Sequence, residues 1–174
     1  MTDGQARLVV RRGGAQDVRF LRDMLHHAYY WKERVPDVGP GPVALYVKAW
    51  GRPGDTAVIA SDKGFPVGAA WYRLFGRDRP GYGFVDERTP ELAIAVVPNA
   101  RGRGVGSALL GALLDRAREA GYPSISLSVD RTNEGAIELY ERYGFHRVVE
   151  DEDSVTMLAH LDSSTSSNEG TDTA

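Results

Sequence analysis

The sequence has 174 residues, of which 42% are hydrophobic and 26% are charged, and this composition fits one globular domain with a core of its own. The absence of cysteine excludes disulfides, thiolate metal ligands and a cysteine nucleophile, and the net charge of −3 argues against broad attraction to nucleic acid or an anionic membrane. We see no apolar run of membrane-spanning length and no secretory signal, so we expect a cytoplasmic protein.

The two ends of the chain differ from its middle. Residues 162–174 contain no large apolar side chain, so they cannot bury enough surface to offset the entropy of ordering, and we expect a disordered tail. Residues 1–6 are expected to fray because they form a polar terminus. The predicted folded domain therefore covers residues 7–161.

In the first half of the domain, strands and helices alternate. The predicted elements are a strand over 8–12, a helix that starts near Asp17, a short helix over 43–50, and a hairpin of strands over 56–61 and 66–75. Residues 76–90 form a long connection rich in Gly and Pro. Loops of this length inside compact domains are usually functional or disordered.

The second half has the clearer pattern. The predicted elements are a central strand over 91–97, a helix over 104–120, a strand over 124–129, a helix from Asn133 to Tyr143, and a hairpin over 145–151 and 155–159. Strand, helix and strand in succession imply one right-handed parallel crossover. We therefore predict an α/β domain in which about four helices flank a mixed, mostly antiparallel sheet of about seven strands.

A glycine-rich loop precedes the strongest predicted helix. Its sequence runs R-G-R-G-V-G from Arg101 to Gly106, so glycines let the backbone approach a ligand and the first amides of the helix point at an anion. The loop lacks the lysine of a Walker motif, and Ser107 or Leu109 stands where a dinucleotide motif has its third glycine. A tight turn with two solvated arginines is the alternative.

Two motifs carry a resemblance to a known family. The R-x-x-G-x-G pattern from Arg101 to Gly106 resembles the pyrophosphate loop of the GNAT superfamily of N-acetyltransferases, and the N-x-x-A-x-x-L-Y-x-x-x-G-F pattern from Asn133 to Phe145 resembles that superfamily's later motif. The motifs are one helix and one strand apart, as in the superfamily. Motif identity covers 94–145 and element order covers 8–159. The resemblance implies a GNAT-like fold and an acetyl-CoA-dependent N-acetyltransferase.

The resemblance also implies how the co-substrate is held. Backbone amides of the glycine-rich loop would take the pyrophosphate, the pantetheine arm would lie beside Val96, and the N–H of Ile94 would face the thioester oxygen. The residues expected to contact the coenzyme are Ile94, Val96, Arg101, Gly102, Arg103, Gly104, Val105, Gly106, Ser107 and Asn133.

Two residues are candidates for proton transfer. Tyr140 would reprotonate the departing thiolate, although a role in packing on Ile137 and Tyr143 is the alternative. Glu91 would act as base on the amine, directly or through water. Strand alternation places Glu91 and Ile94 on opposite faces, so only a bulge between them would bring both to the acyl carbon. A solvated carboxylate at a strand end is the alternative for Glu91.

The acceptor is expected to be a primary amine on a small molecule or peptide, which attacks directly in a ternary complex. Tyr82, Phe84, Asp86 and Glu87 are the candidate acceptor contacts, and these carboxylates, which also compete with Glu91 for the role of base, would suit a cationic acceptor. No metal, nucleic-acid or membrane partner is expected, and the resemblance is compatible with a homodimer. A non-catalytic acyl-CoA sensor or scaffold, and a transferase for succinyl- or propionyl-CoA, are the alternatives.

Overall fold

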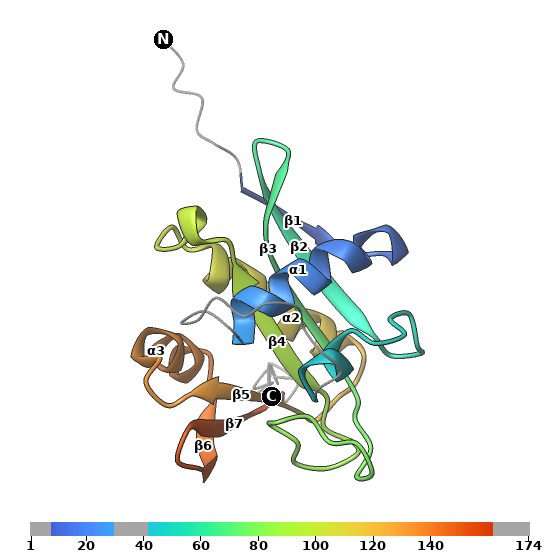
Figure 1. Cartoon of the computed structure of the whole chain (residues 1–174), viewed down its shortest axis with the longest axis vertical. Helices are drawn as coiled ribbons and strands as arrows, with labels where there is room; N and C mark the ends of the chain where they lie inside the picture. Colours follow the sequence, from blue (N-terminus) through green and yellow to red (C-terminus); the bar gives the residue numbers. More distant parts are fainter. Residues whose placement is uncertain (1–7, 30–41, 162–174) are drawn as a thin grey trace, which may run out of the picture.

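The computed structural model describes residues 8–29 and 42–161, so the predicted frayed start and disordered tail lie outside the described residues. A seven-stranded sheet runs through the domain in the order β1-β2-β3-β4-β5-β7-β6 (Figure 1). The strands are β1 (Leu8–Arg12), β2 (Thr56–Asp62), β3 (Phe65–Arg73), β4 (Glu91–Val96), β5 (Ser124–Asp130), β6 (His146–Glu150) and β7 (Ser154–His160). Among the strands of the described residues, only β4 and β5 pair in parallel, which confirms the predicted mixed sheet with one parallel crossover.

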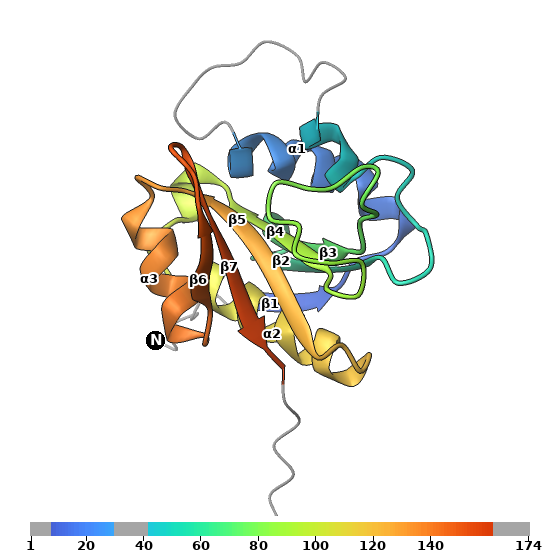
Figure 2. The same ribbon diagram turned by 90° about the horizontal axis from the view of Figure 1, so that it is seen from below.

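Helices cover both faces of the sheet. Figure 2 shows α1 (Val18–Tyr29) on one face and α2 (Val105–Glu119) on the other. The third helix, α3 (Glu134–Arg142), shares the α2 side, since its Ile137 and Tyr140 belong to the same apolar cluster as Leu109 of α2. The second cluster joins α1 to the opposite face through residues such as Leu21 and Ala93. The central strand is therefore buried on both faces, as its continuous apolar run predicts.

The predicted number of α-helices is one too high. The described residues form three α-helices, and the segment expected to form a short helix over 43–50 is instead the 3₁₀ helix η2 (Pro42–Tyr46). Ala49 follows with a positive φ of 51°, which the right-handed helix does not allow. Too few residues therefore lie between Pro42 and Ala49 for a cooperative α-helix to form.

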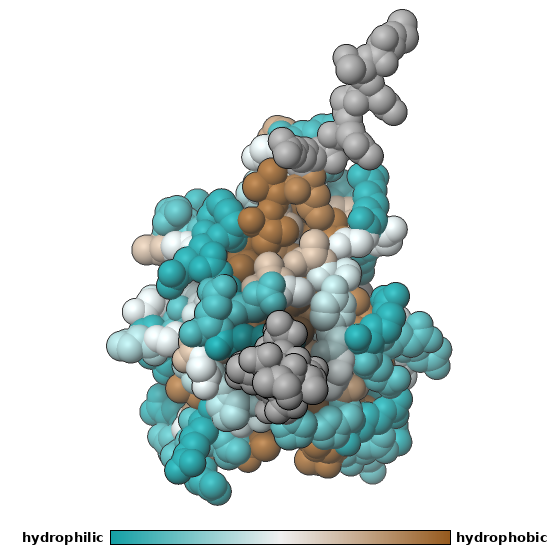
Figure 3. All heavy atoms as spheres, turned by 180° about the vertical axis from the view of Figure 1, so that it is seen from behind, coloured by the Kyte–Doolittle hydropathy of each residue, from teal (hydrophilic) through white to brown (hydrophobic). Residues whose placement is uncertain are grey.

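The surface on the α2 side is mostly hydrophilic. Figure 3 shows apolar side chains gathered toward one end of this face, near the β2–β3 hairpin. Phe65 at this hairpin is 74% exposed, whereas Leu8 and Val67 are partly buried against the α2-side cluster.

β4 and β5 separate soon after they begin. Their parallel pairing is limited to Glu91 with Ser126 and Leu92 with Leu127, whereas β4 stays paired with β3 over its whole length and β5 stays paired with β7. The sheet therefore opens between the later parts of β4 and β5. Backbone groups at this opening have no neighbouring strand, so a ligand can reach them.

Candidate functional site

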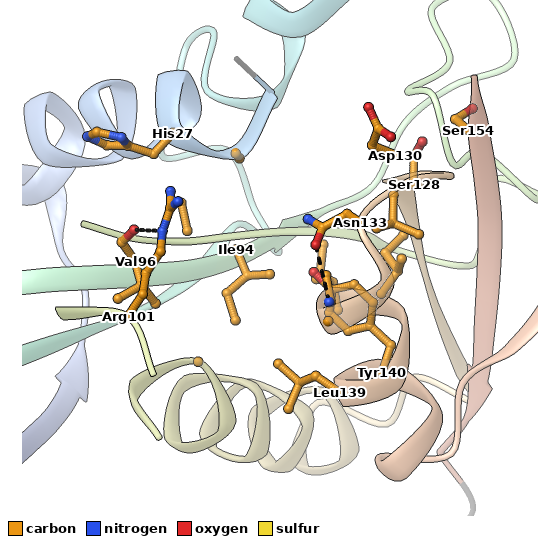
Figure 4. A pocket seen from close by; sticks show the side chains of 18 of the residues that line it. His27, Ile94, Val96, Arg101, Ser128, Asp130, Asn133, Leu139, Tyr140 and Ser154 are labelled. Carbon is orange, nitrogen blue, oxygen red and sulfur yellow. Dashed lines mark hydrogen bonds between the residues drawn. The ribbon is translucent and has the colours of Figure 1, made fainter. Parts of the chain in front are cut away.

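A cavity of about 1150 Å³ occupies the opening between β4 and β5. Its walls come from β4, the start of α2, β5, α3, the β6–β7 hairpin and the end of α1 (Figure 4). Most of the residues predicted to contact a coenzyme line it: Ile94, Val96, Arg101, Gly102, Gly104, Val105, Gly106, Ser107 and Asn133. Arg103 is the exception, since it is exposed and does not line the cavity.

The start of α2 offers unpaired amides to this cavity. Gly104 is the N-cap residue with φ of +80°, a left-handed conformation that favours glycine. A Cβ at Gly104 would find no atom within 4 Å, so the space beside the loop is open. The first N–H groups of an α-helix have no carbonyl partner within the helix and carry its partial positive charge. This end of the cavity is therefore suited to an anion.

Arg101 adds a guanidinium to the same end. Its Nε donates to the carbonyl oxygen of Val96 at 3.2 Å, which fixes the side chain at the end of β4, beside the cavity (Figure 4). Among the described residues, no group forms a hydrogen bond with the terminal nitrogens of this guanidinium. Guanidinium groups bind phosphate oxygens in a forked geometry.

The amide of Ile94 points into the gap between the strands. Val97 donates its N–H to Val67 of the neighbouring strand at 2.8 Å. Since the amides of a strand point alternately to its two sides, the N–H of Ile94 points away from β3 and toward β5. β5 is no longer paired with β4 at this position, so this amide can donate to a ligand.

Tyr140 faces the cavity from α3. Its side chain is buried beside Phe145, with the ring centroids 5.8 Å apart, and Figure 4 shows it across the opening from Ile94. Burial raises the pKa of Tyr140 above its ordinary value, so its hydroxyl keeps its proton throughout the neutral range. Among the described residues, no group forms a hydrogen bond with this hydroxyl, which leaves its proton available to a ligand.

α3 is capped at its start and tied to α2 at its end. Asn133 caps the helix, with its Oδ1 accepting the N–H of Ala136 at 3.3 Å. The hydroxyls of Ser107 and Tyr143 lie 2.5 Å apart, and Tyr143 also bonds the Ser107 carbonyl at 3.0 Å. The start of α2 and the end of α3 are therefore held together on the side where Tyr140 lies.

Glu91 lies outside the cavity. β4 runs without a bulge, so Glu91 points to the α1 face while Ile94 points to the α2 face. The structure therefore does not bring the two residues together at one acyl group. Glu91 is only 1% exposed, and burial raises its pKa from 4.5 to about 7, partly offset by hydrogen bonds from Tyr46 and Gly83.

Of the predicted acceptor contacts, only Tyr82 lines the cavity. Phe84 packs on the α1-side core. Asp86 accepts the backbone N–H groups of the residues at positions 88 and 89, and Glu87 accepts the N–H of Arg77 at 3.1 Å. Phe84, Asp86 and Glu87 thus stabilise the loop over 76–90 and do not reach the cavity, because short-range hydrogen bonds and packing already use them.

Several residues that line the cavity carry no signal of a site in the sequence. Asp130, at the end of β5, lies on the side opposite Arg101 (Figure 4). The β6–β7 hairpin adds Asp151, Glu152 and Asp153 to the lining. His27 and Val43 line it from the α1 side.

In the described part of the chain, no helix is long and apolar enough to cross a bilayer, and no three His, Cys, Asp or Glu side chains gather in a way that could hold a metal ion.

Comparison with known proteins gives consistent matches. A model of the acetyltransferase (GNAT) family matches residues 20–145. A mycothiol acetyltransferase from Propionibacterium freudenreichii subsp. shermanii is 35% identical over 103 residues, which are 59% of this chain and 31% of that protein. The L-methionine sulfoximine/L-methionine sulfone acetyltransferase of Pseudomonas paraeruginosa is 34% identical over 115 residues, which are 66% of this chain and 63% of that protein.

The fold is also found among solved structures. A phosphinothricin acetyltransferase from Sinorhizobium meliloti in complex with acetyl-CoA superposes with a TM-score of 0.67 at 23% identity, covering 88% of each chain. This likeness shows a common fold. The match to the mycothiol acetyltransferase spans only about a third of that protein's length.

Proposed function

Because this chain belongs to the acetyltransferase (GNAT) family, we propose that it transfers an acetyl group from acetyl-CoA to a primary amine by direct attack in a ternary complex. The observation that carries the proposal is the cavity between β4 and β5. It brings an anion-binding helix start, a free strand amide and a buried tyrosine hydroxyl to one opening. Acyl transfer from a phosphorylated thioester needs these three groups.

The cavity residues fit a coenzyme with a diphosphate. The amides that begin at Gly104 supply donors and partial positive charge, the space beside them is open, and Arg101 adds a fixed guanidinium. The apolar side chains of Ile94, Val96 and Leu139 line the next part of the cavity and suit the pantetheine arm. Bound coenzyme would supply an activated acetyl group at the far end of that arm.

Two groups of this chain would then act on the reaction. The N–H of Ile94 would donate to the carbonyl oxygen as negative charge develops there, and such a donor contributes roughly 3–4 kcal/mol. The hydroxyl of Tyr140 would give its proton to the sulfur as the carbon–sulfur bond breaks and the new carbon–nitrogen bond forms. The nitrogen would release its proton to solvent water, and Tyr140 would regain one from there. A general acid of this kind accelerates turnover by about 10²–10⁴-fold.

The acceptor would enter from the end of the cavity away from Arg101. Carboxylates from β5 and the β6–β7 hairpin line that end, namely Asp130, Asp151, Glu152 and Asp153. A negative potential there favours the cationic acceptor that the sequence predicts. The carboxylates that supply this potential differ from the predicted Asp86 and Glu87, which do not line the cavity. Tyr82 and Val43 would provide an apolar contact for the acceptor's carbon chain.

A thiol-release assay tests the proposal. Acetyl-CoA would be incubated with the protein and a panel containing L-methionine sulfone, an aliphatic diamine, an aminoglycoside and a short peptide with a free N-terminus. We expect amine-dependent release of free CoA with at least one class. Succinyl- and propionyl-CoA, run in parallel, test the acyl group. Coenzyme that binds but is never consumed with any donor or amine would indicate a sensor or scaffold instead.

A further inference from the structure

The loop over residues 76–90 is held at its middle by buried hydrogen bonds. Tyr82 lines the cavity, and the adjoining Gly83 lies against β5. We infer that Glu91 and Tyr46 are positioning residues that fasten this part of the loop and thereby set Tyr82 as the wall of the acceptor end. The role in acceptor binding rests on the proposed function, whereas the fastening itself does not.

Both Glu91 and Tyr46 bond the loop backbone at Tyr82 and Gly83. The hydroxyl of Tyr46 donates to Oε1 of Glu91 and accepts the N–H of Tyr82 at 3.0 Å. The same Oε1 accepts the N–H of Gly83 at 2.8 Å. One carboxylate oxygen and one phenol thus hold two successive amides of the loop.

β5 holds the same peptide from the other side. The hydroxyl of Ser126 donates to the carbonyl oxygen of Gly83 at 2.8 Å. A Cβ at Gly83 would lie 2.5 Å from the carbonyl carbon of Leu127, so only glycine allows this approach. Ser126 pairs with Glu91, and the next pair, Leu127 with Leu92, is the last point where β4 and β5 meet. The loop therefore closes the apex of the opening between the strands.

Tyr46 is itself fixed to the sheet through the backbone of η2. Arg73 donates to the carbonyl oxygens of Leu45 and Lys48 at 2.9 and 2.8 Å, and the indole N–H of Trp71 donates to the carbonyl oxygen of Tyr46 at 3.1 Å. Because these bonds hold the backbone, the phenol cannot follow the loop if it shifts. Tyr46 is therefore a rigid anchor for the loop.

The same contacts argue against Glu91 as a base on the amine. A base must reach the proton that it removes, directly or through one water. Glu91 is buried on the α1 face, does not line the cavity, and has Oε1 occupied by two donors. Its Oε2 is buried without a hydrogen-bond partner among the described residues. The carboxyl group is thus turned toward the loop backbone.

Three variants test the inference, namely Glu91→Gln, Glu91→Ala and Tyr46→Phe. Glutamine retains a carbonyl oxygen that can accept both bonds, so E91Q should rescue what E91A loses. The first readout is trypsin cleavage of the loop after Arg77 and Arg88, with cleavage after Arg116 in α2 as the internal measure of global unfolding. We expect loop cleavage about tenfold faster in E91A and Y46F, with E91Q near wild type.

The second readout is kinetic, with acetyl-CoA and the most active amine of the panel. We expect E91A and Y46F to raise the KM for the amine several-fold more than they lower kcat, and E91Q to stay close to wild type. A kcat for E91Q reduced by about 10²–10⁴-fold, with the loop still protected, would overturn the inference and make Glu91 a base. Unchanged loop cleavage in Y46F and E91A would overturn it as well.

The two proposals fail in different ways. If the wild-type protein neither binds CoA nor consumes acetyl-CoA, the proposed function fails, and the cleavage pattern of the variants still decides whether the loop is fastened as we infer. If CoA binds equally well to all three variants while the loop opens only in E91A and Y46F, the fastening is separate from coenzyme binding.

Discussion

Glu91 and Ile94, three residues apart on β4, face opposite sides of the sheet. Ile94 lines the cavity, whereas Glu91 is buried beside Tyr46 beneath the loop over 76–90. The strand therefore faces the cavity on one side and carries a buried carboxyl group on the other. A change at Glu91 reaches the cavity only through the loop that it holds.

Glu91 should make the stability of the protein depend on pH. Its pKa is raised from 4.5 to about 7, so the folded protein binds a proton between these values that the unfolded chain has lost. The protonated Glu91 contributes fully to the free energy of unfolding below pH 4.5, and this contribution is lost as the pH rises through 7. A shift of this size corresponds to about 3 kcal/mol.

Urea unfolding at pH 5 and pH 8 measures this effect. Wild type should be less stable at pH 8 than at pH 5. In Glu91→Gln we expect this difference in the free energy of unfolding to be much smaller, since glutamine does not titrate. Glu138→Gln, on the exposed side of α3, is the matched control and should leave the pH dependence as in wild type. Parallel pH profiles for E91Q and wild type would show that Glu91 titrates normally.

Substitution of the two glycines that flank α2 separates an effect on coenzyme binding from an effect on folding. Gly104 and Gly121 flank the helix with φ of +80° and +84°, and a Cβ at either would find no atom within 4 Å. Valine should therefore strain both positions alike, by an amount of order 1–3 kcal/mol. Only Gly104 lines the cavity, so we expect G104V to weaken CoA binding at least about tenfold and G121V to leave it unchanged.

Calorimetric titration with CoA, together with the thermal midpoint of each variant, makes the comparison. If both variants lose affinity in proportion to their stability, the loop before α2 is a structural turn and does not bind the coenzyme.

Tyr140→Phe removes the hydroxyl at the cavity and leaves the ring on Phe145. We expect kcat to fall about 10²–10⁴-fold while the Kd for CoA stays nearly constant, because the hydroxyl acts on the departing sulfur. Tyr122→Phe, outside the cavity, is the control and should retain full turnover. Steady-state kinetics and a CoA titration on the two variants decide the matter; an active Y140F would exclude Tyr140 as the acid.

Asp55 and Arg73 should matter for stability. They form a buried, bidentate ion pair with N–O distances of 3.1 and 2.5 Å, and Arg73 also holds the η2 backbone. Asp55→Ala leaves a buried guanidinium without its partner, so we expect a loss of about 3–5 kcal/mol in the free energy of unfolding. The exposed Asp115, paired with Arg118, should tolerate alanine with little change. Denaturant titrations of both variants compare the two pairs.

The sequence was most informative where structure depends on neighbours in the chain. The glycine-rich loop and the Asn133 cap are local signals, so the motifs could place the loop before α2 and Tyr140 of α3 at one cavity. The prediction of an α-helix over 43–50 was wrong, because the positive φ at Ala49 ends the helical segment early and leaves only the 3₁₀ helix η2.

The acceptor end could not be placed in this way because it depends on long-range pairing. Asp130 meets the hairpin residues 151–153 only because β5 pairs with β7, and nothing near these residues in sequence indicates that pairing. Asp86 and Glu87, chosen for their position in a long loop, are instead used by hydrogen bonds within that loop. Exposure of a loop residue in sequence does not determine the direction of its side chain.

Titration of the purified protein with CoA, followed by calorimetry, tests the central claim most directly. We predict saturable binding at one site per chain, with a Kd between about 1 μM and 1 mM, the usual range of substrate KM values. A protein of normal thermal stability that gives no binding heat and no thermal shift with CoA would contradict the account.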